Sequence, residues 1–320
     1  MRLLVLGGTS WLGGAVAEEA VAHGWDVTCL ARGESGAVPA GATLMAADRW
    51  QPRAYDGLPE FDAAVEVSWQ PELVRTALAS VRATHWVYVS SISAYADGSS
   101  ANELLPAWAG TGLASREVYG EAKVACEEAY LAALPVERTL IARVGLIGGY
   151  GDRSDRLGYW PARIASAVGA RREVLVPEPT SGAVQVIDVL DLAQWLVLGA
   201  QTRVSGVFDV VGREASLQDV LDASVRAAGA DPLFVPAAAE QLLAAGVRPW
   251  MGPESLPLWV PSDGAELSRD NSAAQAAGLV LRPLEATVSA ALRWERELGL
   301  DRERTSGLSA EREIAILGSL

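Results

Sequence analysis

Near its start the 320-residue chain reads Leu3-Leu4-Val5-Leu6-Gly7-Gly8-Thr9-Ser10-Trp11-Leu12-Gly13-Gly14, followed by an alanine-rich segment. The apolar residues predict a strand and the alanines predict a helix, with a glycine-rich turn between them. Such a turn lets backbone N–H groups approach a pyrophosphate, and the helix N-terminus adds the positive end of its dipole. We therefore predict a dinucleotide-binding turn; the alternative is a β–α turn with a purely structural role. The predicted cofactor contacts in this turn are Gly7, Thr9, Ser10, Trp11, Leu12 and Gly13.

Ser10 departs from the spacing Gly-x-x-Gly-x-x-Gly, which has its middle glycine at this position. The side chain is small enough for a tight turn, and its hydroxyl has two uses. It can bond to a phosphate, or it can cap the N-terminus of the following helix. The sequence leaves both uses open.

Short runs of β-branched and apolar residues alternate with alanine-rich amphipathic segments through the first half of the chain. This rhythm is typical of βαβ units and predicts a parallel sheet. The predicted strands cover residues 2–6, 26–31, 43–46, 62–67, 85–90 and 139–144, and the predicted helices cover residues 13–22, 71–81 and 116–133. Beyond residue 148, glycines and prolines interrupt the pattern. We predict a doubly wound, Rossmann-type α/β core over residues 1–148, then a smaller substrate lobe over 149–320 with returning core elements and a charged, solvated C-terminal helix.

The chain is strongly acidic, with 26 lysines and arginines against 40 aspartates and glutamates, a net charge of −14. Such a surface repels nucleic-acid backbones and anionic lipid, so we expect a small-molecule substrate and neither nucleic acid nor membrane as a partner. Cys29 and Cys126 lack the spacing of a zinc site or a disulfide scaffold, so we expect no metal and a reducing, cytoplasmic location. The uncharged residues 3–17 resemble a signal peptide, but their apolar core has only the length of a strand.

The end of the second predicted strand bears on the choice between nicotinamide cofactors. NAD-binding folds place a carboxylate there, which binds the ribose 2′-hydroxyl. Here the strand ends Leu30-Ala31-Arg32-Gly33, without an acid. A cation at this place can bind a 2′-phosphate, so we predict that Arg32 contacts the cofactor and that NADP is preferred, with NAD as the alternative.

One lysine, Lys123, stands among 25 arginines in the 26 basic residues of the chain. It follows Tyr119 by four residues, a spacing that puts both side chains on one face of a helix. An ammonium near a phenol stabilises the phenolate and makes a general acid or base that works near neutrality. We predict that Tyr119 and Lys123 are catalytic; the alternative is a chance pair on a surface helix.

A third catalytic group is expected where a strand ends. The predicted strand 85–90 leads into Ser90-Ser91-Ile92-Ser93 at the carboxyl edge of the sheet, where open α/β folds bind their ligands. A hydroxyl there can donate to a substrate carbonyl or to a developing oxyanion. Spacing alone leaves Ser90, Ser91 and Ser93 as candidates, beside a purely structural strand-end turn.

These residues together resemble the extended short-chain dehydrogenase/reductase family, which includes nucleotide-sugar epimerases, dehydratases and many ketone reductases. The resemblance spans about residues 1–198. It is carried by the glycine-rich turn, the stretch 89–95 (Val-Ser-Ser-Ile-Ser-Ala-Tyr), the motif from Tyr119 to Lys123 and the stretch 186–193 (Val-Ile-Asp-Val-Leu-Asp-Leu-Ala).

The resemblance implies roles for further residues. The catalytic serine or threonine of the family stands four residues before a tyrosine, so Tyr95 selects Ser91 among the three serines. Asp48, after the third strand, matches the acid that contacts the adenine. Val144 matches the residue beside the nicotinamide.

The usual mechanism of the family passes hydride between the nicotinamide and a carbinol or carbonyl carbon of the substrate. The resemblance then implies that Tyr119 carries the proton, that Ser91 holds the substrate oxygen and that Lys123 binds the ribose. It also implies a homodimer built from the helix that contains Tyr119 and its neighbouring helix.

Two departures from the family bear on the substrate. Ile92-Ser93 stands where dehydratases carry Asp-Glu, and the stretch 143–146 lacks the Pro-x-Asn of nucleotide-sugar enzymes. Aromatic residues of the second half suit a less polar ligand, so we predict Tyr159 and Trp160 as substrate contacts, with two further tryptophans as candidates. Those tryptophans are Trp250 and Trp259. The strand-end hydroxyl of Ser93 is a further predicted substrate contact.

We therefore predict an NAD(P)-dependent oxidoreductase that reduces a carbonyl on a small, partly apolar molecule. The enzymatic alternative is an epimerase that acts on a sugar or nucleotide sugar through a keto intermediate with the same three residues. The non-enzymatic alternative is a dinucleotide sensor, for which an activated tyrosine has no physical use.

Overall fold

The computed structural model describes residues 1–96, 102–167, 172–261 and 268–320, which form two compact units. The first unit comprises Met1–Gly145, Val189–Val211 and Arg269–Val280. The second comprises Leu146–Asp188, Gly212–Ser268 and Leu281–Leu320. The chain thus leaves the first unit after Gly145 and returns to it twice, so the second unit is assembled from three separate segments.

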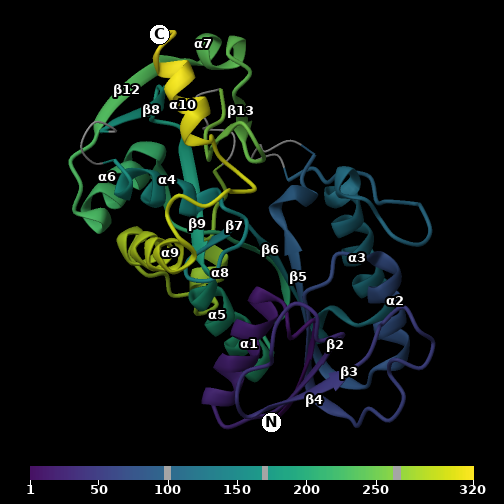
Figure 1. Cartoon of the computed structure of the whole chain (residues 1–320). Coiled ribbons are helices and arrows are strands. Elements are labelled where there is room, and N and C mark those ends of the chain that lie inside the picture. The colour runs from purple at the N-terminus through teal and green to yellow at the C-terminus, as the bar shows by residue number, and fades with distance from the viewer. Residues whose placement is uncertain (97–101, 168–171, 262–267) are drawn as a thin grey trace. The chain divides into compact units, whose positions relative to one another are not determined.

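A seven-stranded parallel sheet forms the centre of the first unit, in the order β10-β6-β5-β4-β1-β2-β3 (Figure 1). Its strands are β1 (Arg2–Leu6), β2 (Asp26–Ala31), β3 (Ala42–Ala46), β4 (Phe61–Glu66), β5 (Ala83–Ser91), β6 (Thr139–Val144) and β10 (Gly206–Val210). The strand order reverses between β1 and β4, and doubly wound folds bind ligands at the carboxyl ends of such a switch point. The predicted Rossmann-type fold is confirmed.

Helices cover both faces of this sheet, which explains why its central strands are apolar on both sides. Helix α1 (Trp11–Ala22) packs against α5 (Val189–Thr202), while α2 (Pro71–Ser80) packs against α3 (Tyr119–Ala133) on the opposite face (Figure 1). The short α8 (Ser272–Ala276) contacts β10. The predicted helix over 116–133 is divided, because Arg116–Val118 form the 3₁₀ turn η2 and the α-helix begins at Tyr119.

Aromatic packing holds α3 against β5. Tyr130 stacks on Tyr88 with ring centroids 4.9 Å apart, and it meets Trp86 edge to face at 5.7 Å. All three rings are buried, and aromatic pairs of this kind contribute about 0.5–1.5 kcal/mol each beyond the area that they bury. Since β5 and α3 carry Ser91, Tyr119 and Lys123, this packing limits how far these candidates can move relative to one another.

The second unit combines three small sheets with five helices among its described residues. Its strands are β7 (Leu146–Gly148), β8 (Glu173–Glu178), β9 (Ala183–Asp188), β11 (Glu214–Ser216), β12 (Leu233–Ala238), β13 (Arg248–Trp250) and β14 (Ser255–Pro257). They pair as β11-β9-β7, β12-β8 and β13-β14. The helices are α4 (Arg156–Ala165), α6 (Leu217–Ala228), α7 (Ala239–Ala244), α9 (Leu284–Leu298) and α10 (Ala310–Leu317). Within the described ranges, neither unit has a helix with the length and hydropathy of a membrane crossing.

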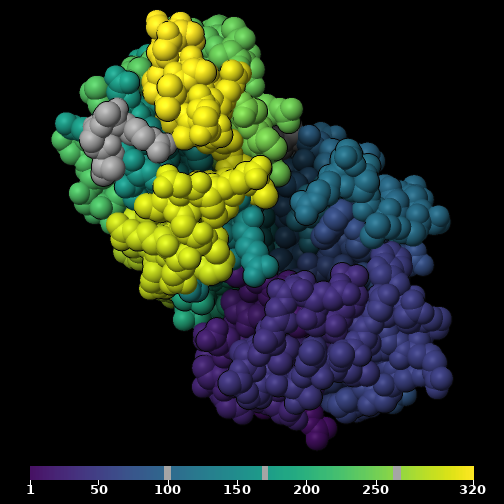
Figure 2. Space-filling model, viewed as in Figure 1, coloured from purple at the N-terminus to yellow at the C-terminus, as the bar shows by residue number. Residues whose placement is uncertain are grey.

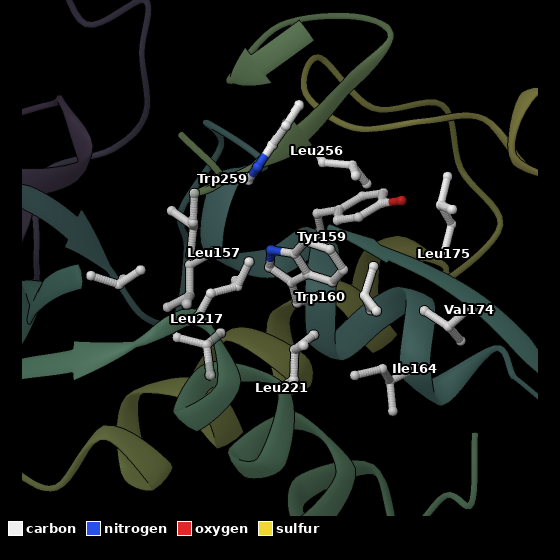
Figure 3. Packing of buried hydrophobic residues seen from close by; sticks show 14 of the residues in the cluster. Leu157, Tyr159, Trp160, Ile164, Val174, Leu175, Leu217, Leu221, Leu256 and Trp259 are labelled. Carbon is white, nitrogen blue, oxygen red and sulfur yellow. The ribbon is translucent and has the colours of Figure 1, made fainter. Parts of the chain in front are cut away.

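Trp160 lies in the middle of the apolar core of the second unit (Figure 3). Its ring is fully buried, its indole N–H donates to the carbonyl oxygen of Pro257 at 2.8 Å, and Tyr159 meets it edge to face at 5.1 Å. The prediction that Tyr159 and Trp160 contact substrate is therefore wrong for this structure. Trp259 is buried in the same cluster, and Trp250 packs against it. An aromatic side chain suits a core and a pocket equally well, so the sequence could not separate the two.

The charged C-terminal segment also differs from the solvated helix that its alternating charges predict. Arg302 and Arg304 lie between α9 and α10, outside any helix, and both bind the buried carboxylate of Glu295, at 2.9 and 2.8 Å. Glu313 of α10 is buried in an ion pair with Arg163. The segment lies on the outside of the second unit, in yellow in Figure 2. Several of its charges therefore anchor the segment through buried ion pairs.

Candidate active site

The glycine-rich turn joins β1 to α1 at the switch point of the sheet. Gly7 has a φ of +93°, a left-handed conformation that favours glycine. A Cβ at Gly13 would overlap the carbonyl oxygen of Gly7, and a Cβ at Gly8 would overlap the sulfur of Cys29. The glycines thus allow strand and helix to approach closely, with the N–H groups of the first helical turn directed out of the helix end. This is the backbone geometry that binds a pyrophosphate.

Ser10 takes the capping role. Its Oγ accepts from the backbone N–H of Gly13 at 3.2 Å and donates to the carbonyl oxygen of Gly7 at 2.7 Å. The hydroxyl proton is therefore used inside the turn, and the geometry favours the N-cap over a direct bond to phosphate.

The end of β2 carries two opposite charges. Arg32 is exposed, and its guanidinium lies 3.1 Å from the carboxylate of Glu34. The sequence places no acid in the last residues of the strand, but the loop brings one beside the arginine. A carboxylate here suits the ribose hydroxyls of NAD and a guanidinium suits the 2′-phosphate of NADP, so the choice between the cofactors stays a prediction.

Asp48 follows β3 in a segment that a buried ion pair holds in place. Its carboxylate accepts from the backbone N–H of Trp50 at 3.1 Å. The next residue, Arg49, binds the Glu66 carboxylate at the end of β4 through two hydrogen bonds and donates to the Tyr55 hydroxyl at 2.9 Å. Burial alone would lower the pKa of Arg49, but the charge of Glu66 raises it above its ordinary value. The pair fixes the Asp48 segment to β4, beside the switch point.

Tyr119 and Lys123 share one face of α3, as their spacing predicts. The ammonium nitrogen of Lys123 lies 5.8 Å from the centre of the Tyr119 ring. It donates to the carbonyl oxygen of Val89 at 2.6 Å and to that of Ser68 at 3.4 Å. Val89 is near the end of β5 and Ser68 follows β4, so the structure brings the buried cation and the partly exposed phenol together at the carboxyl edge of the sheet.

Trp69 is a site residue that the sequence analysis missed. Its indole meets the Tyr119 ring edge to face, with centroids 5.3 Å apart and an angle of 62°. The neighbouring side chain of Gln70 donates to the carbonyl oxygen of Ala114 at 3.1 Å and accepts from its N–H at 2.8 Å. These contacts connect the loop after β4 to the segment that precedes α3. A tryptophan in a loop follows no periodic pattern, so no sequence signal marked it.

The three serines that spacing left open have different surroundings. Ser90 is buried and its Oγ donates to Glu127 at 2.5 Å. Ser91 ends β5, and its Oγ accepts from the N–H of Ser93 at 3.1 Å, which uses a lone pair and not the hydroxyl proton. Ser93 is exposed on the 3₁₀ turn η1 (Ile92–Ala94). Ser90 and Ser91 are both buried, but the hydroxyl proton of Ser90 is used by Glu127, whereas the bond from Ser93 leaves that of Ser91 available, which favours Ser91 as the donor to a substrate oxygen.

The start of α3 packs directly on η1. A Cβ at Gly120 would overlap the carbonyl oxygen of Ser93, so this glycine allows the close approach. Tyr119 therefore lies next to the turn that follows Ser91. Val144 pairs with Ser91 in the register of β5 and β6, which puts the predicted nicotinamide neighbour beside the candidate serine.

No family model and no curated protein matches this chain. Solved structures do match. One is a proposed epimerase from Burkholderia cenocepacia, with 22% identity, a TM-score of 0.67, and coverage of 92% of this chain and 98% of that one. The UDP-glucuronic acid 4-epimerase of Bacillus cereus, solved with NAD, has 13% identity, a TM-score of 0.65, and coverage of 93% and 99%. The UDP-glucose 4-epimerase of Thermus thermophilus, also solved with NAD, has 16% identity, a TM-score of 0.64, and coverage of 92% and 99%. The chain shares the fold of these three structures over nearly its whole length.

Proposed function

We propose that the first unit binds a nicotinamide dinucleotide and that the protein catalyses hydride transfer at a carbonyl or carbinol carbon. The observation that carries this proposal is the pairing of Tyr119 with the single lysine of the chain, at the sheet edge that also holds the glycine-rich turn. Lys123 is buried on α3 with its ammonium bonded to two backbone carbonyls, while Tyr119 stays partly exposed beside it. A phenol beside a buried ammonium is suited to proton transfer.

The residues present fit such a cofactor. A Cβ at Gly8 would collide with Cys29 of β2 and a Cβ at Gly13 with the Gly7 carbonyl, so these glycines permit the tight turn whose backbone N–H groups a pyrophosphate needs. Asp48 would contact the adenine, Lys123 a ribose hydroxyl, and Val144 the nicotinamide. When bound, the nicotinamide ring supplies the donor or acceptor of hydride.

The side chains of this site then have separate tasks. Tyr119 gives a proton to the carbonyl oxygen during reduction, or removes one from the hydroxyl during oxidation. Ser91 donates a hydrogen bond to the same oxygen and stabilises the charge that develops on it. Lys123 keeps a positive charge beside the phenol. Trp69 packs edge to face on the Tyr119 ring and so limits the orientations that this ring can take.

The variant Tyr119→Phe tests this proposal. It should lower turnover by about 10²- to 10⁴-fold, the usual contribution of a positioned acid or base, while NADH and NADPH binding stays close to wild type. Tyr130→Phe is the matched control, because Tyr130 lies on the same helix but inside the core. Turnover is measured with saturating cofactor on a panel of aryl ketones, α-keto esters and UDP-glucose. A Tyr119→Phe protein that keeps full turnover contradicts the proposal.

Epimerisation is the second candidate, because the structures of the same fold described above are named as epimerases. An epimerase returns its hydride to the substrate, whereas a reductase consumes one NAD(P)H for each turnover. Incubation with UDP-glucose separates the two: a new hexose without net change in absorbance at 340 nm supports epimerisation. A loss of absorbance that follows the ketone concentration supports reduction. The burial of Tyr159 and Trp160 removes one argument for an apolar substrate. The experiment therefore tests both carbonyl reduction and epimerisation.

The cofactor preference depends on Arg32 and Glu34. Arg32→Ala should weaken NADPH binding about tenfold or more if the guanidinium contacts the 2′-phosphate, because hydrogen bonds between charged groups contribute about 1.5–3 kcal/mol. Glu34→Ala should weaken NADH binding in the opposite case. The two titrations, followed through tryptophan fluorescence, decide between NADP and NAD.

A further inference from the structure

Glu127 is a buried carboxylate that joins three segments of the candidate site. It lies on α3, four residues after Lys123 and eight after Tyr119, so all three side chains lie along one face of the helix. Its Oε1 accepts from the Ser90 hydroxyl at 2.5 Å. Its two oxygens accept from Arg143, with the shortest contact at 2.7 Å.

Each segment that Glu127 joins carries a residue of the proposed site next to its contact. Ser90 directly precedes Ser91, and Arg143 directly precedes Val144. The register of β5 and β6 pairs Ser90 with Arg143 and Ser91 with Val144. Successive residues of a strand face opposite sides of a sheet. Because Ser90 and Arg143 are bonded to Glu127 on one side, the side chains of Ser91 and Val144 are directed to the other side.

Arg143 extends the network beyond Glu127. Its guanidinium donates to the Tyr95 hydroxyl at 3.0 Å, and that hydroxyl donates to Asp209 at 2.7 Å. Arg269 lies 3.5 Å over the Tyr95 ring and donates to Asp209 at 3.0 Å. The side chains of this network are thus bonded to one another, and together they connect the ends of β5, β6 and β10.

We propose that Glu127 is a positioning residue that holds Lys123 and Ser91 in their working places through α3 and Ser90. The inference rests on the proposed function, because the residues that it positions are those of the hydride-transfer site. A purely structural ion pair would stabilise the fold without affecting the side chain of Lys123.

The single lysine makes the position of this side chain measurable. Protein labelled with [ε-¹³C]lysine has one lysine signal, that of Lys123, in a ¹H–¹³C spectrum. Glu127→Gln removes the charge partner of Arg143, and Ser90→Ala removes one hydrogen bond without any change of charge. The control Glu313→Gln breaks an ion pair of matched burial, with side chains 3% and 10% exposed against 3% and 12% for Glu127 and Arg143. Ser224→Ala is the control for a buried serine hydroxyl, since Ser224 is buried in the second unit.

We expect both site variants to shift or broaden the lysine signal, and both controls to leave it at the wild-type position. The kcat of Glu127→Gln should fall by about 10²-fold, as for a small misplacement of reacting groups, and the KM for cofactor should rise, because a displaced Lys123 loses its contact with the ribose. A lysine signal that stays in place in both site variants overturns the proposal, and so does an equal shift in the controls. Ser90→Ala keeps the test valid if Glu127→Gln does not fold.

The failure of the proposed function gives a different result. In that case NADH and NADPH leave the lysine signal of the wild-type protein unmoved, whatever the variants do. A wild-type signal that responds to cofactor while the variants stay unchanged overturns only the role of Glu127.

Discussion

At the scale of single residues, the candidate site contains polar groups with fixed partners. The hydroxyl of Ser90 donates to Glu127, and that of Ser10 caps α1. The ammonium of Lys123 donates to two backbone carbonyls. Tyr119 differs, because its ring is partly exposed and its neighbours are an aromatic ring and a cation. The hydroxyl group of Tyr119 is therefore the one that suits a chemical role.

Tyr130 provides a stability prediction on the same helix. Its buried hydroxyl has no hydrogen-bond partner among the described residues, and burial raises its pKa well above the ordinary value, so the phenol stays neutral. An unsatisfied buried hydroxyl costs about 1–3 kcal/mol. We expect Tyr130→Phe to raise the free energy of unfolding by up to about 1 kcal/mol in urea titrations. A loss of more than about 1 kcal/mol would mean that this hydroxyl has a partner that stabilises the fold.

The sequence shows some of these residues and hides others. Tyr119 and Lys123 stand out because their spacing matches one helical turn and because lysine is otherwise absent from the chain. Glu127 follows Lys123 by four residues, so the same spacing would have predicted that it lies on the same face of the helix. Arg143 and Tyr95 gain their roles through contacts across 16 and 48 residues, which no local pattern contains.

At the scale of secondary structure, apolar runs bounded by turn residues predict the strands closely. The strands at Arg2–Leu6, Asp26–Ala31 and Thr139–Val144 have the predicted bounds. β5 is longer than predicted, from Ala83 to Ser91, because pairing with both β4 and β6 extends it over polar residues. The helix predicted from residue 116 begins at Tyr119, since the preceding three residues form a 3₁₀ turn.

The turn between β1 and α1 gives a prediction with an internal control. In Gly13→Ala the new methyl group would collide with the Gly7 carbonyl, a backbone atom that cannot move without opening the turn. We expect a loss of about 1–3 kcal/mol in stability, as for overpacking, and at least tenfold weaker NADH binding. In Gly14→Ala the nearest atom lies 3.7 Å away, so the helix should gain up to about 1 kcal/mol and binding should not change. Equal NADH affinities for the two variants would contradict the role of the turn.

At the scale of the whole molecule, the chain divides into a regular parallel sheet and a second unit of short elements. Periodicity predicts the first because each strand and helix repeats one pattern. The second depends on contacts between distant segments, such as that of Arg302 with Asp155 and Glu295, so its core and its ion pairs could not be predicted.

His85 connects the stability of the molecule to pH. Burial lowers its pKa below the ordinary value, and the nearby Arg203 and Arg138 act in the same direction against a backbone hydrogen bond at Val204. The unfolded chain therefore binds a proton more readily, so the stabilising contribution is present above a pH of about 6.5 and is lost as the pH falls through the folded value. The free energy of unfolding should fall more between pH 7.5 and pH 5.5 in wild type than in His85→Gln. Parallel pH profiles in urea titrations would refute this assignment.

The central claim is that the first unit binds a nicotinamide dinucleotide against Lys123. Protein labelled with [ε-¹³C]lysine reports on this residue alone, because the chain has one lysine. We predict that NADH or NADPH shifts the single lysine signal in a saturable manner, and that Gly13→Ala weakens this response. A signal that neither cofactor moves at millimolar concentration, in a protein that is folded, would contradict the claim.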